Sequence, residues 1–190
     1  MKGRIQCFNF LFSLRNNGEN RNFILFEFST MYWTSVNTRE PWRENGIFKA
    51  AMDGSGRRKL AEIFAFGISI DVQSKRLYWA QQVRGTDVAK IQSSNLEGGE
   101  IVTIAELSGF FFKITFYGQR LYMNSPFSTT IKSVTTAGTD LRVEYTGSVP
   151  IYELTVPTST LGNRTNPCKG QNCAGLCLLT PASFRCLPWQ

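Results

Sequence analysis

Hydrophobic and polar residues alternate along much of the chain, in short runs that are separated by turns. Clear examples are Ile68 to Val72 (Ile-Ser-Ile-Asp-Val) and Ile114 to Phe116. Because successive side chains of a β-strand point to opposite faces, such runs place apolar residues on one face of a strand. Gly, Thr, Ser and β-branched residues are frequent, and they favour short strands and tight turns over long helices. The pattern predicts a mainly β chain.

An aromatic motif recurs three times, with 46 residues from its first tyrosine to the second and 44 from the second to the third. The copies begin at Tyr32-Trp33-Thr34, Tyr78-Trp79-Ala80 and Tyr122-Met123-Asn124. Each unit continues to an isoleucine that is followed seven residues later by a glycine, and these pairs are Ile47 with Gly54, Ile91 with Gly98, and Ile131 with Gly138. Recurrence at one period indicates a structural repeat.

Each unit of the repeat is expected to contain four strands. The alternating run precedes the aromatic motif, a third strand leads from the isoleucine into the glycine turn, and an outer strand follows at residues 60–64, 101–105 or 141–145. Four short strands in about 45 residues are typical of one blade of a β-propeller. A last strand is expected near Val149 to Val156. The aromatic residues of the motif are expected to pack in the core rather than to bind a ligand; they are Tyr32, Trp33, Tyr78, Trp79 and Tyr122.

The five cysteines are spread unevenly, because Cys7 stands alone near the start and the others lie near the end, at Cys168, Cys173, Cys177 and Cys186. A disulfide framework and a tetracysteine zinc site are two interpretations of such a cluster. The spacing contains no Cys-x-x-Cys pair, which favours disulfides and no metal. An N-glycosylation acceptor at Asn163-Arg164-Thr165 also fits the secretory route.

The motifs Tyr32-Trp33-Thr34 and Tyr78-Trp79, the Met52-Asp53-Gly54 turn and the later cysteines together resemble the YWTD propellers of the low-density lipoprotein receptor and its related proteins. The resemblance covers about residues 23–155. It implies an all-β fold with a partial YWTD β-propeller of about three four-stranded antiparallel blades at residues 22–157, a linker at 158–166 and a truncated EGF-like module at 167–190. Residues 1–21 do not resemble the repeat. Propellers of the family have six blades, so the three units correspond to half a ring.

The resemblance also has consequences for individual residues. It implies the disulfide pairs Cys168 with Cys177 and Cys173 with Cys186, and it leaves Cys7 without an evident partner. The final Asp of the motif is replaced here by Ser35, Gln81 and Asn124 or Ser125, which puts the hydrogen bonds of that acid in doubt. Residues 162–167 contain no Asp or Glu, so no calcium site is expected. We expect no metal and no cofactor.

Composition excludes several kinds of chemistry. The chain has no histidine, which excludes a Ser-His or Cys-His relay, an imidazole metal ligand and a histidine pH switch. The net charge is +7, and the positively charged residues are scattered along the chain. Their one run, Arg57 to Lys59, follows a turn and is expected to be solvated. Nucleic-acid binding is therefore not expected. The N-terminus is at best a poor signal peptide, and no stretch approaches the roughly 20 apolar residues of a membrane span.

The resemblance implies an extracellular ligand-binding or structural part of a receptor related to the low-density lipoprotein receptor, endocytic or signalling. It would act by protein–protein contact and join the membrane only through parts absent from this chain. Aromatic and Arg side chains on loops are the usual contacts, and the candidates are Arg39, Trp42, Arg43, Gln82, Arg84 and Phe127. The alternative is a secreted matrix or adhesion protein, which a membrane segment in the full-length product would exclude. An enzyme is not expected, since a glycine-flanked Ser elbow and a convincing carboxylate pair are also missing.

Overall fold

The computed structural model describes residues 12–15, 20–27, 29–37, 45–125, 127–151, 154, 176–179 and 184–187, and the side chains of residues 29–36, 45–125, 127–151 and 154. Within these ranges the regular structure consists of strands only, which confirms the predicted all-β class. No helix among the described residues has the length and apolar character needed to cross a membrane.

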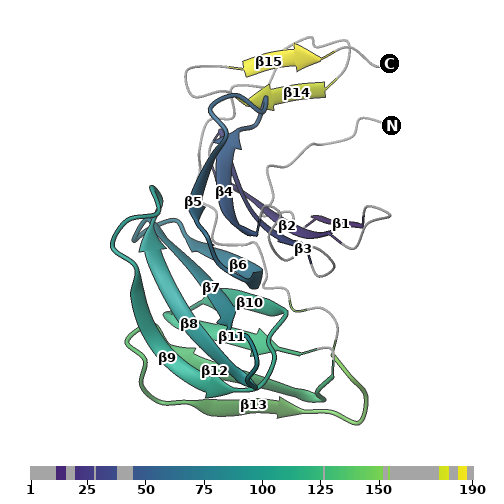
Figure 1. The fold of residues 1–190 in the computed structure, drawn as a ribbon, viewed down its shortest axis with the longest axis vertical. Helices are drawn as coiled ribbons and strands as arrows, with labels where there is room; N and C mark the ends of the chain where they lie inside the picture. The colour runs from purple at the N-terminus through teal and green to yellow at the C-terminus, as the bar shows by residue number, and fades with distance from the viewer. Residues whose placement is uncertain are drawn as a thin grey trace.

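Three antiparallel sheets follow one another along the chain, and we number them as the first, second and third blades (Figure 1). The first blade contains β1 (Phe12–Arg15), β2 (Asn20–Glu27), β3 (Thr30–Asn37), β4 (Gly46–Ala51) and β5 (Arg58–Ala61). The second contains β6 (Ala65–Asp71), β7 (Arg76–Gln82), β8 (Val88–Asn95) and β9 (Val102–Ser108). The third contains β10 (Lys113–Tyr117), β11 (Arg120–Asn124), β12 (Thr130–Thr135) and β13 (Arg142–Thr146).

The predicted repeat is confirmed, because its members occupy equivalent places in all three blades. Tyr32, Tyr78 and Tyr122 lie on β3, β7 and β11, which are the central strands next to the inner strands β2, β6 and β10. The repeat glycines share one backbone conformation, with φ of +83° at Gly54, +82° at Gly98 and +82° at Gly138. This left-handed conformation favours glycine and closes each hairpin between the third and outer strands.

Two details of the first blade differ from the sequence expectation. Its outer strand is Arg58–Ala61 rather than residues 60–64, because the hairpin pairs Lys49 with Arg58 and Phe48 with Lys59. Phe64 is left outside the sheet, just before β6. Residues 12–15 form β1 and pair with β2, so this blade has five strands where four were expected.

Every outer strand joins its blade through an irregular pairing at the same repeat position. The register shifts between Ile47 and Phe48 in the first blade, between Ile91 and Gln92 in the second, and between Ile131 and Lys132 in the third. Each shift follows the isoleucine of the repeat. A β-bulge at such a position bends the strand and increases its twist.

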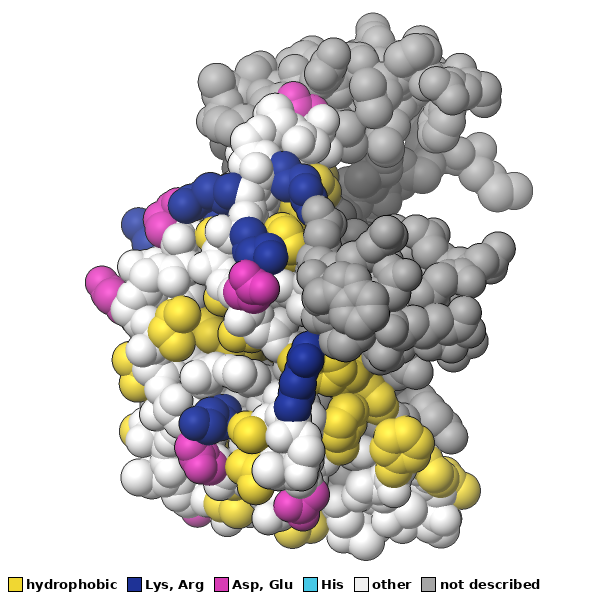
Figure 2. Space-filling view, viewed as in Figure 1, with side chains coloured by type: hydrophobic (Ala, Val, Ile, Leu, Met, Phe, Trp, Pro, Cys, Tyr) yellow, Lys and Arg dark blue, Asp and Glu magenta, His cyan; other side chains and the backbone are white. Residues whose placement is uncertain are grey.

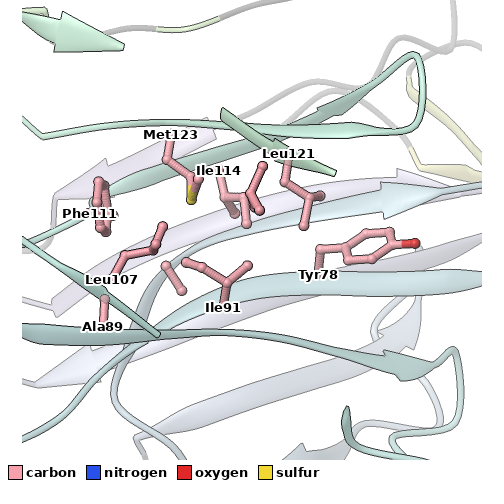
Figure 3. Packing of buried hydrophobic residues seen from close by; sticks show 10 residues of the cluster. Tyr78, Ala89, Ile91, Leu107, Phe111, Ile114, Leu121 and Met123 are labelled. Carbon is pink, nitrogen blue, oxygen red and sulfur yellow. The ribbon is translucent and has the colours of Figure 1, made fainter. Parts of the chain in front are cut away.

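The hydrophobic core lies between the blades rather than inside one of them. One cluster joins the first and second blades and contains Tyr32, Ile47, Leu77 and Trp79. A second cluster joins the second and third blades and contains Tyr78, Ile91, Leu121 and Met123 (Figure 3). Of the aromatic residues expected in the core, Tyr32, Tyr78 and Trp79 are buried, whereas Trp33 and Tyr122 are half-buried.

The basic run Arg57 to Lys59 takes part in contacts between and within blades. Arg58 and Lys49 both form ion pairs with Glu97, which lies in the β8–β9 turn of the second blade. Burial, and then the nearby Arg58, lower the pKa of Lys49. Lys59 lies 3.8 Å from Glu62, and Arg57 lies over the ring of Phe48. The run was expected to be solvated, and its three residues are exposed, although Arg58 and Lys59 belong to β5 rather than to a turn.

A polar constellation recurs at the first residue of the central strand in two blades. Arg76 donates to Ser93 Oγ and pairs with Glu100 at 3.1 Å. Arg120 donates to Ser133 Oγ and pairs with Asp140 at 2.8 Å. These pairs fix the hairpin tip of each blade to its central strand, and the short motif of the repeat gave no sign of them.

Asp140 is expected to contribute stability that depends on pH. Hydrogen bonds from Arg142 and then Arg120 hold the pKa of Asp140 below its ordinary value of 3.8. The ionised carboxyl therefore stabilises the fold above that value, and the contribution is lost as the pH falls further. Urea unfolding at about pH 6 and about pH 2 should show a smaller acid-induced loss in Asp140→Asn than in the wild type. An equal loss in both proteins would show that Asp140 contributes nothing.

The C-terminal hairpin comprises β14 (Leu176–Leu179) and β15 (Phe184–Leu187), and its register places Cys177 opposite Cys186. Side chains of this hairpin, together with Cys7, Cys168 and Cys173, lie outside the described residues. The EGF-like module, its disulfide pairing and the glycosylation acceptor at Asn163 therefore stay predictions.

Candidate protein-binding surface

Loops of the second and third blades come together at one end of the two sheets. In the second blade Ala65 pairs with Gln81, so the residues before β6 and those after β7 lie at the same end. In the third blade Lys113 pairs with Asn124, so the residues before β10 and those after β11 lie together as well. Because β6 and β10 are neighbours, these four segments form one surface.

Five phenylalanines meet on this surface, and we call them the phenylalanine cluster: Phe64, Phe66, Phe110, Phe112 and Phe127. Ring centroids are 5.1 Å apart for Phe64 and Phe66 and 4.5 Å for Phe66 and Phe112, both edge-to-face. Phe127 lies 5.9 Å from Phe112. Spacings of this size are favourable for aromatic pairs. Phe66 is buried at the base, whereas Phe127 is 81% exposed.

A close backbone approach brings the rings of the two blades together. A Cβ atom on Gly67 would lie 2.8 Å from the carbonyl oxygen of Phe112 and 3.0 Å from the amide nitrogen of Ile114. Only glycine leaves room for β10 at this distance from β6. The register of β6 with β7 is irregular over the same stretch, between Ala65 and Ile68. Gly67 thus allows Phe66 and Phe112 to pack against each other.

Basic groups lie beside the phenylalanine cluster. The Arg84 guanidinium is 5.7 Å from the ring centroid of Phe64, and the Lys132 ammonium is 5.8 Å from that of Phe111. A cavity of about 250 Å³ opens beside Phe127, with Phe110 and Lys132 in its walls. Figure 2 shows hydrophobic side chains grouped on the lower right of the visible face, with a basic side chain beside them. The surface combines apolar area with positive charge.

The structure places only part of the predicted ligand-binding set on this surface. Arg84 and Phe127 lie at opposite ends of it. Gln82 was expected in an exposed loop, but it ends β7, is 5% exposed, and donates its amide to the carbonyls of Thr86 and Val88. It therefore shapes the loop and offers little area to a partner. Arg39, Trp42 and Arg43 lie outside the described residues.

The other members of the phenylalanine cluster were missed at the sequence level. The repeat predicts Phe64 in an outer strand, and it does not indicate a role for Phe66, Phe110 or Phe112. The available signals are abundance, because the chain contains 15 phenylalanines, and the run Phe110-Phe111-Phe112. Abundance does not indicate which of them converge, since that depends on how neighbouring blades pack.

A second cleft, of about 440 Å³, lies between the second and third blades at the opposite end. Its polar groups already bond within the chain. Asp71 accepts hydrogen bonds from the backbone of Gln73 and Ser74, and Arg76 pairs with Glu100. Tyr78 also lines the cleft, and burial raises the pKa of its hydroxyl. Among the described side chains, no three His, Cys, Asp or Glu residues are grouped as metal ligands would be.

Comparison with solved structures identifies the fold. The chain superposes on a gluconolactonase from Xanthomonas campestris with a TM-score of 0.55 at 14% identity, covering 72% of this chain and 51% of that one. It superposes on an oligogalacturonate lyase in complex with manganese with a TM-score of 0.50 at 11% identity, covering 68% and 37%. A chain of a nidogen/laminin complex gives a TM-score of 0.38 at 19% identity, covering 57% and 56%. The chain is part of a β-propeller.

The likenesses to the gluconolactonase and the lyase show the fold alone, since the identities are low. The chain spans about half the length of the gluconolactonase and of the chain from the nidogen/laminin complex. No protein-family model matches the sequence.

Proposed function

We propose that this chain is the extracellular, protein-binding part of a receptor related to the low-density lipoprotein receptor, and that the phenylalanine cluster is its contact surface. The exposure of Phe127 carries the proposal, because 81% of this large apolar side chain faces solvent beside other aromatic rings. Exposed apolar groups of this kind mark interaction sites when they occur together. The motifs of the repeat and the absence of histidine support binding rather than catalysis.

The contact would combine apolar burial with charge attraction. An aliphatic or aromatic side chain of the partner would cover Phe127 and enter the cavity beside it, at about 25 cal/mol for each Å² of apolar surface buried. Carboxylates of the partner would meet Arg84, beside Phe64, and Lys132, in the wall of the cavity beside Phe127. Charge complementarity of this kind mainly raises the association rate and the specificity.

Peptides selected from a random display library for binding to the immobilised chain test this proposal. Phe127→Ser should weaken the selected peptides at least about 30-fold, as expected for an aromatic anchor. Arg84→Ala should weaken acidic peptides most, and more so at low salt. Biolayer interferometry gives the dissociation constants.

Tyr117→Ser is the matched control, because Tyr117 is also an exposed aromatic residue, 45% accessible, but ends β10 at the opposite end of the blade. It should leave the peptides bound with wild-type affinity. Peptides that lose no affinity with Phe127→Ser, or lose as much with Tyr117→Ser, would show that the phenylalanine cluster is not the contact surface.

A further inference from the structure

Each blade has two unlike faces, and the one that bears the repeat tyrosine packs against the following blade. We call this the receiving face. Tyr78 stacks on Phe116 of the third blade, with centroids 5.6 Å apart and the rings 9° from parallel. The repeat isoleucines on the same face are 1% exposed at Ile47 and 0% at Ile91. The repeat isoleucines of a receiving face are therefore covered where a further blade follows.

The receiving face of the third blade is less covered. Its repeat isoleucine, Ile131, is half-buried, as is Tyr122. Tyr145, which pairs with Ile131, is 54% exposed. No further blade follows among the described residues. The third blade thus presents the same residues as the other two, in the same places, with apolar area left open.

The opposite face, which we call the docking face, bears the residues on either side of the repeat tyrosine. Leu77 and Trp79 in the second blade and Leu121 and Met123 in the third are buried against the blade before them. The equivalent residues of the first blade, Met31 and Trp33, are only half-buried. The first blade therefore leaves a docking face partly open.

The turn glycines show the same difference at the rim of the docking face. A Cβ on Gly98 would lie 2.8 Å from Leu60 of the first blade, and one on Gly138 would lie 2.1 Å from the Ile104 carbonyl oxygen of the second. Gly54 has the same φ, but no described atom lies within 4 Å of its Cβ position. The turn of the first blade has the shape that packs on a preceding blade, although no described residue packs against it.

On the receiving face of the third blade, polar side chains bond to backbone groups of residues 151 and 154. These backbone groups lie where the inner strand of a following blade would lie. Ser69 Oγ accepts a hydrogen bond from the amide of Phe116, at 2.9 Å, and the equivalent Thr115 donates to the carbonyl of Leu154, at 3.4 Å. Likewise Thr34 donates to the Phe66 carbonyl, and the equivalent Asn124 donates to the Ile151 carbonyl. Residues 151 and 154 hold the place of that strand.

We propose that two copies of this chain associate head to tail, with the receiving face of the third blade of each copy bound to the docking face of the first blade of the other. A second copy fits because one chain carries both halves of the contact. It also spans 51% of the gluconolactonase that shares its fold, so two chains supply about the length of one such propeller. In the pair, β2 of the other copy takes the place of residues 151 and 154. Unlike faces that meet in this way form a ring when the rotation closes.

The test compares the wild-type chain with Met31→Glu, which places a charge on the docking face, and Tyr122→Glu, which places one on the receiving face. Light scattering after size exclusion should give the wild type twice the 21.5 kDa of one chain. Each variant alone should halve that mass, because both contacts of the pair then contain a charged side. An equimolar mixture of the two variants should recover the doubled mass, because one of its two contacts is fully wild type. Far-UV circular dichroism verifies that each variant is folded.

Val102→Glu is the control, since Val102 is 51% exposed on an outer strand and lies on neither open face of the array. It should keep the doubled mass. Three outcomes would overturn the proposal: a wild-type mass of one chain at every concentration, loss of association in only one of the two face variants, or no recovery on mixing.

Discussion

Gly138→Ala should destabilise the chain by about 3 kcal/mol, because the new side chain meets strain and a clash together. Gly138 has φ +82°, which side-chain-bearing residues rarely adopt. Its Cβ would lie 2.1 Å from the carbonyl oxygen of Ile104, so the third blade would have to move away from the second. Urea unfolding followed by far-UV circular dichroism gives the change in free energy.

The matched control is Gly54→Ala, at the same position of the first blade. Its φ of +83° is equally unfavourable, but no described atom lies within 4 Å of its Cβ position. In the unassociated chain the expected cost is about 1 kcal/mol, from the backbone alone. The difference between the two variants measures the contact between blades. Equal costs would show that this contact contributes nothing beyond the local turn.

Trp79→Ala is expected to cost about 3–5 kcal/mol, as for other large aromatic residues that are truncated in a core. Trp79 is 1% exposed and belongs to the cluster that joins the first and second blades. Its indole nitrogen also donates to Gln92 Oε1 at 3.0 Å. A cost of about 5 kcal/mol equals a large part of the free energy of unfolding of an ordinary domain. The variant should therefore unfold at a lower urea concentration than the wild type.

Trp33→Ala serves as its control, because Trp33 holds the same repeat position in the first blade but is half-buried. It stacks on Phe48 with centroids 5.6 Å apart. In the unassociated chain we expect a cost of about 1–2 kcal/mol, in line with the smaller apolar area buried. Far-UV circular dichroism is the appropriate probe, since each substitution removes a fluorophore. Similar costs at the two positions would contradict the assignment of the core to the space between blades.

The blades themselves were predictable from the sequence, because their determinants are local. Tyr32, Tyr78 and Tyr122 recur at a nearly constant spacing, and each hairpin carries a glycine at its turn. Alternation of apolar and polar residues then fixes which side of a strand is buried. The strands Gly46–Ala51, Ala65–Asp71 and Val88–Asn95 accordingly lie where the pattern indicates them.

The candidate site was not predictable to the same degree, because it arises between blades. Phe66 and Phe112 are 46 residues apart and meet only because Gly67 admits the neighbouring strand. Arg58 pairs with Glu97 across 39 residues, which a run of basic residues does not reveal. Gln82 appeared to be a loop residue because its burial depends on the loop that folds back over it.

The bulges that recur after Ile47, Ile91 and Ile131 have a consequence for solubility. An outer strand such as β13 exposes Val143 and Tyr145. A straight row of free amide and carbonyl groups along its edge would pair with the edge strands of other molecules. The added twist interrupts that row once in every blade. Edge-to-edge pairing into fibrils is thereby disfavoured, while the faces of the sheets can still pack against one another.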